Sequence, residues 1–447
     1  MSTATSVTGG QPGNRSGDRS GNRSGDRVDV RDRTDIARQL KLVVVFALVG
    51  CATIFFAWAI DNPTVLYTLG ERISQDEPAR EMNGRVVAWL AALVALVALV
   101  LAAVNRVPRG ALGMAVFLLV GVAFFTGLII WSFADQSLGR PLAIVNPLPG
   151  TIRFATPLVL GALAGCLCER AGVINIAIEG QLLVGAFFAS VASSMAYSAE
   201  MGLVGGVLAG VGMAALLAVF ALRYQVNQVV LGVVLIALAT GLTSFLLSQI
   251  PNEPFYKERL NEPLKLERLP IPGLSDIPII GPTLFDQTLL VYLMYASVFV
   301  VTFLLYQTRW GLRVRAVGEH PKAADTVGIK VNRVRWQAVL LGGVFAGLGG
   351  AYFTVGSTGA FDNNASAGNG FIALAAVIMG RWHPVGASLA ALFFGFVWTL
   401  QTQLTFLGKI PDELLRASPY LATIIAVAGF VGRVRPPAAD GESYVKS

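Results

Sequence analysis

The chain carries little charge for its length. Only 14% of its 447 residues are Asp, Glu, Lys or Arg, whereas about 25% is usual for a soluble domain. Hydrophobic residues make up 54% of the chain, and the mean hydropathy is +0.64. A soluble fold would leave too much of this apolar surface in water, so the composition predicts a polytopic membrane protein.

Cysteine and histidine are scarce too. The three cysteines fall in or at the end of apolar runs, and His320 and His383 are far apart in the sequence. No metal-ligand spacing and no disulfide framework is visible. A Walker A pattern is also missing, because the one Gly-Lys pair, Gly408-Lys409, is followed by Ile410. We therefore expect no metal site and no bound cofactor, and we expect any ATP to bind to another subunit.

Long apolar runs dominate what is present. A membrane-spanning helix needs about 20 apolar residues. Runs of this kind lie near residues 40–60, 86–104, 110–133, 151–167, 175–197, 202–222, 228–249, 289–307, 336–355, 385–405 and 418–432. Residues 371–380 are apolar but too short to cross alone. The expected fold is an all-α polytopic membrane protein with about 11 transmembrane helices and one candidate re-entrant half-helix.

The basic residues indicate how the chain is oriented. Eight Lys or Arg precede the first span, and residues 308–335 contain seven. Lys and Arg accumulate in cytoplasmic loops, so we expect both segments, and therefore the N-terminus, in the cytoplasm. The net charge of +7 is then a topology signal and does not indicate nucleic-acid binding.

The first 40 residues differ in character from the rest. Residues 13–28 read GNRSGDRS and then GNRSGDRV, an eight-residue duplication with almost no apolar content. Such a segment cannot bury enough surface to offset the loss of chain entropy. We expect residues 1–40 to be a disordered cytoplasmic tail.

The short apolar piece at 371–380 affects the number of membrane crossings between the span at 336–355 and the C-terminus. Arg433 and Arg435 favour an internal C-terminus, which fits if residues 371–380 enter from outside and the chain breaks at Arg381-Trp382-His383-Pro384. Irregular backbone at membrane depth needs protein or a water-filled cavity around it, so such a break would indicate a pathway. An ordinary interfacial loop that begins at Pro384 explains the same residues.

Polar residues gather in CERAGVINIAIEG, residues 168–180, inside an otherwise apolar region. The stretch contains Glu169, Arg170, Asn175 and Glu179. Asn175 and Glu179 are four apart and would share one face of a helix. A carboxylate inside a bilayer is costly and should face the protein interior. From the residues alone, a pathway contact and a structural hydrogen bond to a neighbouring helix stay equally open.

Two further stretches predict local structure. In the charged loop 309–335, Pro321 suits the first turn of a helix and Gly328 suits its end. A short helix along the membrane face is one interpretation, and a plain basic loop is the other. Gly343 and Gly347 are four apart, a spacing that lets membrane helices approach closely, so we expect tight helix packing there.

Three blocks of the sequence resemble the permease subunits of ABC importers for branched-chain amino acids, simple sugars and nucleosides, above all the nucleoside and simple-sugar branch. The blocks are ERAGVINIAIEGQLLVGA at 169–186, GLRVRAVGEHPKAADTVGI at 311–329 and GNGFIALAAVIMGRWHPVGA at 368–387. The resemblance implies a permease core at 148–432. Transmembrane helices at 41–147 would precede this core as an extension, and a cytoplasmic tail at 433–447 would follow it.

The resemblance implies a multi-pass transport subunit in the cell membrane, without catalysis of its own. It would belong to an ATP-driven importer of nucleosides or related small polar solutes such as simple sugars. Its partners would be a cytoplasmic ABC ATPase that binds the ATP, a second permease subunit that forms a heterodimer with it, an extracellular solute-binding protein or lipoprotein, and membrane lipid. An ion-coupled secondary transporter with Glu179 as its proton site is the alternative.

The resemblance also assigns roles to residues. A short helix near Ala316–Thr326 would dock into the ATPase, and the coupling residues would be Arg315, Ala316, Gly318, Glu319, Pro321, Ala323, Ala324, Asp325 and Gly328. The candidates for the substrate path are Asn175, Glu179, Asn369 and Phe371. Polar side chains are needed there because a uniformly apolar pore would leave the hydroxyl and base-edge groups of a nucleoside without hydrogen bonds.

Overall fold

The computed structural model describes residues 23–68, 80–108, 110–134, 142–143, 147–251, 253–405, 407–430 and 435–445. The chain divides into two compact units. The first comprises Met1–Leu66 and Glu81–Arg140, and the second comprises Tyr67–Arg80 and Pro141–Ser447. The second unit includes the whole segment 148–432 that we expected to be the permease core.

Three long helices make up most of the first unit: α1 (Arg23–Trp58), α2 (Gly84–Ala103) and α3 (Ala111–Phe133). Helix α1 begins inside the segment 1–40 that we predicted to be a disordered tail, and residues 1–22 lie outside the described residues.

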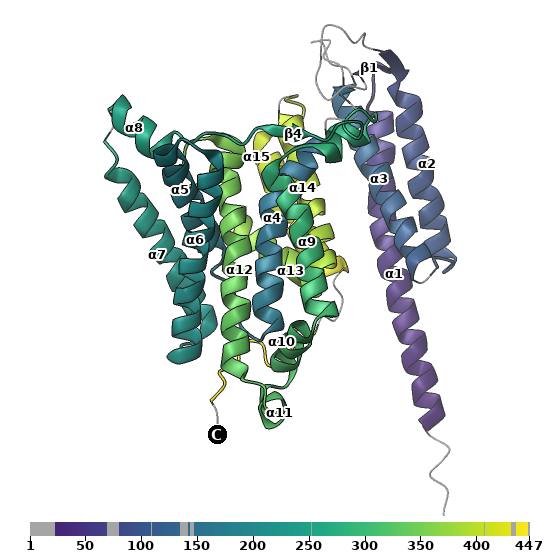
Figure 1. The fold of residues 1–447 in the computed structure, drawn as a ribbon. Helices are drawn as coiled ribbons and strands as arrows, with labels where there is room; N and C mark the ends of the chain where they lie inside the picture. Colours follow the sequence, from purple (N-terminus) through teal and green to yellow (C-terminus); the bar gives the residue numbers. More distant parts are fainter. Residues whose placement is uncertain are drawn as a thin grey trace, which may run out of the picture. The chain divides into compact units, whose positions relative to one another are not determined.

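The second unit is a helix bundle with short irregular connections (Figure 1). Its helices are α4 (Pro147–Arg170), α5 (Ile178–Ala196), α6 (Ala199–Ala218), α7 (Gln228–Ser248), α8 (Pro254–Asn261), α9 (Leu289–Gln307), α10 (Arg309–Glu319), α11 (Pro321–Thr326), α12 (Val331–Phe353), α13 (Asn369–Met379), α14 (Pro384–Thr405) and α15 (Asp412–Phe430). Three π-helical turns are η1 (Val219–Arg223), η2 (Gly281–Phe285) and η3 (Thr354–Thr358). The short strands of the chain are β1 (Thr64–Thr68), β2 (Arg80–Asn83), β3 (Leu142–Ala143), β4 (Arg268–Pro270) and β5 (Asp286–Thr288).

Ten of the described helices are long and apolar enough to cross a membrane. Each overlaps one of the predicted spans, so the prediction of an all-α polytopic membrane protein is confirmed. The eleventh predicted span, 418–432, overlaps α15 and ends outside the described residues. The short apolar piece forms α13, an 11-residue helix.

Helices α4, α5 and α12 form the centre of the bundle. In their most apolar windows 83%, 78% and 72% of the residues are buried, against 28% for α7 and 33% for α9. Glycines let these helices approach one another. A Cβ added at Gly210 of α6 would lie 2.4 Å from the Gly343 carbonyl oxygen of α12, and one at Gly185 of α5 would lie 3.0 Å from the Gly347 carbonyl oxygen. The predicted tight packing of the glycine-rich stretch is confirmed.

The chain breaks between α13 and α14, where the sequence predicts a break. The turn lies against the end of α4, because Arg170 donates hydrogen bonds to the carbonyl oxygens of Trp382 at 2.9 Å and Arg381 at 3.2 Å. His383 stacks on Tyr306 at the end of α9, with 4.7 Å between the ring centroids. The break therefore lies at the ends of spans, beside α10, which favours the interfacial loop over a pathway at this point.

Candidate functional site

The turn between α4 and α5 brings irregular backbone into the bundle. Gly172 ends α4 with φ +81°, and the Val173 N–H closes the end by donating to the Cys168 carbonyl oxygen at 3.0 Å. Ile178, the first residue of α5, packs against Gly161 and Gly165 of α4. These glycines precede the end of α4 by nine and five residues, which is about 8–14 Å of helix. Helix α5 thus begins well inside the bundle.

Asn175 precedes α5 and does not lie on it. Residues 173–177 are not helical, and α5 begins at Ile178. The predicted helix face shared by Asn175 and Glu179 is therefore wrong, because Gly172 stops α4 and the next helix starts only after Ala177. Asn175 is fully buried, and its amide donates to the Gln181 Oε1 at 3.1 Å and to the Cys168 sulfur at 3.5 Å.

Glu179 holds the start of α13. Its Oε1 accepts from the Ser366 hydroxyl at 2.6 Å and from the Gly368 N–H at 2.9 Å, and its Oε2 accepts from the Gly370 N–H at 2.6 Å. The carboxylate is buried. A negative charge at a helix N-terminus is stabilised by the free N–H groups and by the helix dipole. Glu179 thus accepts hydrogen bonds from backbone N–H groups at the start of α13 that have no partner within this short helix.

Helices α5 and α13 pack closely at this point. A Cβ added at Gly370 would lie 2.4 Å from both the Cα and the N of Glu179. Asn369 is buried, and its amide donates to the Ser366 carbonyl oxygen at 2.7 Å. We call Glu179, Ser366, Gly368, Asn369 and Gly370 the α5–α13 junction. It joins two of the predicted path residues, Glu179 and Asn369, across nearly 190 positions of sequence.

One side of the α5–α13 junction is open. Phe371 is 51% exposed, and Tyr420 of α15, also 51% exposed, lies near Gly368. Asn175 makes its hydrogen bonds away from these residues, with Cys168 and Gln181. The structure therefore brings three of the four predicted path residues together and gives Asn175 a separate, buried position.

Glu169 and Arg170, at the end of α4, both bind the turn between α13 and α14. Trp382 donates its indole N–H to the Glu169 carboxylate, while Arg170 binds the carbonyl oxygens of the same turn. Arg381 and Trp382 have φ values of +55° and +56°, a conformation that is costly for residues other than glycine. The two charged residues offset this strain and fasten the α13–α14 turn to α4.

The predicted coupling segment forms two helices instead of one. Helix α10 ends at Glu319 and α11 begins at Pro321, so the helix expected near Ala316–Thr326 is broken at His320. Proline disfavours the helical conformation of the residue before it, which explains the break. Gly328 ends α11 with φ +84°, as its sequence position predicts.

The coupling residues divide between a buried and an exposed side. Gly318 and Ala324 are buried, and a Cβ at Gly318 would lie 2.2 Å from the Arg170 carbonyl oxygen. Ala323 is exposed, and Val327 is 76% exposed. A partner protein can therefore contact the side of α11 that carries Ala323 and Val327, whereas Gly318 and Ala324 pack within this chain.

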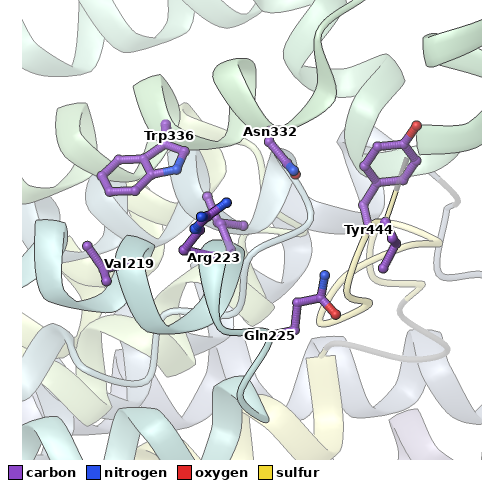
Figure 2. Close-up of a pocket in the computed structure, with 8 residues that line it drawn as sticks. Val219, Arg223, Gln225, Asn332, Trp336 and Tyr444 are labelled. Carbon is purple, nitrogen blue, oxygen red and sulfur yellow. The ribbon is translucent and has the colours of Figure 1, made fainter. Parts of the chain in front are cut away.

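A separate pocket of about 420 Å³ lies between η1 and the start of α12 (Figure 2). Arg223, Gln225, Asn332 and Trp336 line it together with the end of the chain at Tyr444. None of the predicted path residues lines this pocket. Within the described residues, no group of three or more His, Cys, Asp or Glu side chains could hold a metal ion.

The sequence interpretation missed several residues of the site. Ser366 and Trp382 hold the two carboxylates of the 168–180 stretch, and Gln181 binds Asn175. Gln181 could have been noticed as an amide within an apolar span. Ser366 and Trp382 carry no local signal, because their partners are distant in the sequence.

The fold and the site define a polytopic helical membrane protein in which buried polar residues fasten helix breaks. The family model that describes the permease component of branched-chain amino acid transport systems matches residues 148–431. The chain belongs to this family. It is thus a transport component and no enzyme, and the match covers the predicted core.

Several curated proteins are similar to this chain. The guanosine ABC transporter permease protein NupQ of Bacillus subtilis is 39% identical over 67% of this chain and 96% of its own length. The nucleoside ABC transporter permease protein NupC of Lactococcus lactis is 38% identical over 66% of this chain and 95% of its own length. A putative glucose ABC transporter permease protein of Haloferax volcanii, TsgC13, is 36% identical over 63% and 90%. No solved structure matches.

Proposed function

We propose that this chain is the permease subunit of an ATP-driven importer of nucleosides. The observation that carries the proposal is its similarity to two nucleoside permeases along almost their whole lengths, at 39% and 38% identity. The similarity to a putative glucose permease is slightly lower, at 36%, which makes simple sugars the second substrate class. The ion-coupled alternative uses Glu179 as its proton site, whereas both oxygens of Glu179 accept hydrogen bonds at the start of α13, which supports a structural role for this residue.

We place the solute path beside the α5–α13 junction, where α13 is a half-helix that begins inside the bundle and ends at the turn to α14. Phe371 and Tyr420 expose aromatic rings next to the start of α13, and aromatic rings stack with nucleic-acid bases. Glu179 shapes this wall by holding α13. The solute would then meet the aromatic rings and backbone of the half-helix, while the carboxylate stays engaged with Ser366, Gly368 and Gly370.

The orientation of the bundle indicates where the partner proteins would bind. We assign the end with α10 and α11 to the cytoplasm, because residues 309–335 carry seven Lys or Arg. This assignment also puts the N-terminus in the cytoplasm. A cytoplasmic ABC ATPase would dock on the exposed side of α11, at Ala323 and Val327. A second permease subunit and an extracellular solute-binding protein would complete the importer.

Uptake of labelled guanosine, uridine and ribose by cells with and without this gene tests the proposal. We expect uptake of at least one nucleoside to depend on the gene and to stop when ATP is depleted. Uptake that survives ATP depletion but collapses with an uncoupler would instead support the ion-coupled transporter. If only ribose uptake depends on the gene, the solute is a simple sugar, and the assignment to nucleosides is wrong.

A further inference from the structure

The C-terminal tail, residues 435–445, lies against the end of α10. The Ala439 N–H donates to the Gly318 carbonyl oxygen at 2.9 Å, and the Ala438 N–H donates to the Glu319 carboxylate at 3.2 Å. The Ala439 side chain is only 2% exposed. These contacts attach the C-terminal tail to the segment that we assign to ATPase coupling.

The same C-terminal tail reaches the turn between α4 and α5. The Gly441 N–H donates to the Gly172 carbonyl oxygen at 3.3 Å. A Cβ added at Gly172 would lie 2.9 Å from the Ala439 carbonyl oxygen, and a Cβ at Gly441 would lie 2.7 Å from the Ile174 Cδ1. The C-terminal tail therefore fits closely against the turn that leads to the α5–α13 junction.

Two side chains fasten the C-terminal tail further. Arg335 of α12 is fully buried and donates to the Ala171 carbonyl oxygen at 3.1 Å and to the Glu442 carbonyl oxygen at 2.7 Å. Tyr444 lies close to Asp325 of α11, and burial and the interaction with this carboxylate both raise the pKa of Tyr444. One buried guanidinium thus joins the α4–α5 turn to the C-terminal tail, and the C-terminal tail joins both to α11.

We propose that the C-terminal tail is a positioning strap for energy coupling. It holds α10 and α11 in a fixed place relative to the α4–α5 turn, so that a displacement of α10 and α11 reaches the α5–α13 junction. The inference rests on the proposed function, because it presupposes that an ATPase moves α11. The physical reason is that two packed elements transmit a movement only if contacts tie them together in each state.

The adjacent alanines Ala438 and Ala439 provide a matched test. Ala439 is buried and Ala438 is exposed, so Ala439→Gln should displace the C-terminal tail while Ala438→Gln should leave it in place. The transporter, assembled with its ATPase in proteoliposomes, is tested for the ATP hydrolysed per guanosine taken up. Ala439→Gln should raise this ratio about fivefold, in the range of ordinary coupling between sites, with the same amount of bound ATPase. Ala438→Gln should match the wild type.

A milder variant keeps the test decisive if Ala439→Gln does not fold. Tyr444→Phe removes only the hydroxyl that interacts with Asp325, and it should raise the ATP-to-guanosine ratio about twofold or more, as the loss of one polar interaction allows. If Ala439→Gln lowers the amount of folded permease, Tyr444→Phe decides. An unchanged ratio in Tyr444→Phe, or in folded Ala439→Gln, would overturn the inference.

A readout without transport separates this inference from the proposed function. A spin label at Lys322→Cys on α11, in a Cys51→Ser background, reports how firmly α11 is held. Ala439→Gln should increase the mobility of the label, and Ala438→Gln should not. If the label responds but the wild type takes up no nucleoside, the strap stands and the proposed function fails. If nucleoside uptake is ATP-driven but neither ratio nor label responds to Ala439→Gln, only the strap is wrong.

Discussion

Glu179 acts through the helix that it caps. Both carboxylate oxygens accept hydrogen bonds at the start of α13, and the structure gives this buried charge no cationic partner among the contacts described. The N-terminus of α13 stabilises the carboxylate instead, because its N–H groups carry partial positive charge. In the proposed function, Glu179 would shape the solute path by holding α13, and Phe371 would face that path.

Replacement of Glu179 tests this role. Glu179→Gln turns one carboxylate oxygen into an NH₂ donor that faces N–H or O–H donors at Ser366, Gly368 or Gly370. The loss of a hydrogen bond to a charged acceptor costs about 1.5–3 kcal/mol, and we expect nucleoside uptake to fall about tenfold. Uptake per inserted permease measures the effect.

Glu200→Gln is the control for Glu179→Gln. Glu200 also lies in the first turn of a helix and accepts a hydrogen bond from Ser198 at 2.7 Å, but it is exposed. It should transport like the wild type. Equal uptake by Glu179→Gln and the wild type would contradict the capping role.

Asp440 makes the attachment of the C-terminal tail depend on pH. Burial raises the pKa of Asp440 from 3.8 to about 7, although the Arg335 guanidinium and the Gly441 N–H oppose the rise. The docked C-terminal tail therefore keeps a proton that the free chain releases near pH 4. Docking should weaken as the pH rises from about 4 to about 7 and should change little above that range.

A spin label at Ser443→Cys, in a Cys51→Ser background, measures this dependence. We expect the label to be less mobile at pH 5 than at pH 8. Asp440→Asn keeps the side chain neutral, so its label should stay equally immobile at both pH values. Glu442 also acts electrostatically on Arg335, and a pH response that persists in Asp440→Asn would assign the effect to another group.

Helices α10 and α11 form one segment with two surfaces. The side with Gly318 and Ala324 packs within the chain, whereas Ala323 and Val327 face outward. Substitutions on the two sides should therefore have different consequences. A residue that docks a partner must be accessible, and a buried small residue in a close contact tolerates no larger side chain.

Ala323→Arg and Ala324→Arg separate docking from packing. Ala323→Arg should leave the amount of inserted permease unchanged and reduce the ATPase that co-purifies with it, because the added side chain stands on the proposed docking surface. Ala324→Arg should lower the amount of folded permease itself. Full retention of the ATPase by Ala323→Arg would place the docking surface elsewhere.

The protein as a whole combines a family core with an additional helical unit. The family model begins at residue 148, and NupQ is covered to 96% by only 67% of this chain. The first unit, with α1 to α3, is compact by itself. It therefore lies outside the part of the chain that the family shares.

Removal of residues 1–140, which takes away the first unit together with Tyr67–Arg80 of the second, tests whether the first unit takes part in transport. We expect the shortened chain to insert and to retain most of its nucleoside uptake, because the α5–α13 junction, α11 and the C-terminal tail all belong to the second unit. Uptake should be compared at equal amounts of inserted protein. A complete loss of uptake at equal insertion would assign the first unit a part in the transport cycle.

Features that depend on residues close together in the sequence could be predicted well from the sequence alone. The apolar runs located the ten spans, and Gly343 and Gly347 located a close helix contact. Pro321 and Gly328 marked the ends of α11. The single helix expected near Ala316–Thr326 was misplaced, because Pro321 breaks it at His320. The helix face expected for Asn175 and Glu179 was wrong, because Gly172 stops α4.

Hydropathy and basic loops were enough to establish a multi-pass helical protein, because a bilayer admits only long apolar helices whose backbone groups are satisfied internally. The roles of the polar residues required the folded chain. Glu179 meets Ser366 across 187 positions and Arg335 meets Glu442 across 107. Hydrogen bonds of this kind form between groups that packing brings together, and no local pattern in the sequence records them.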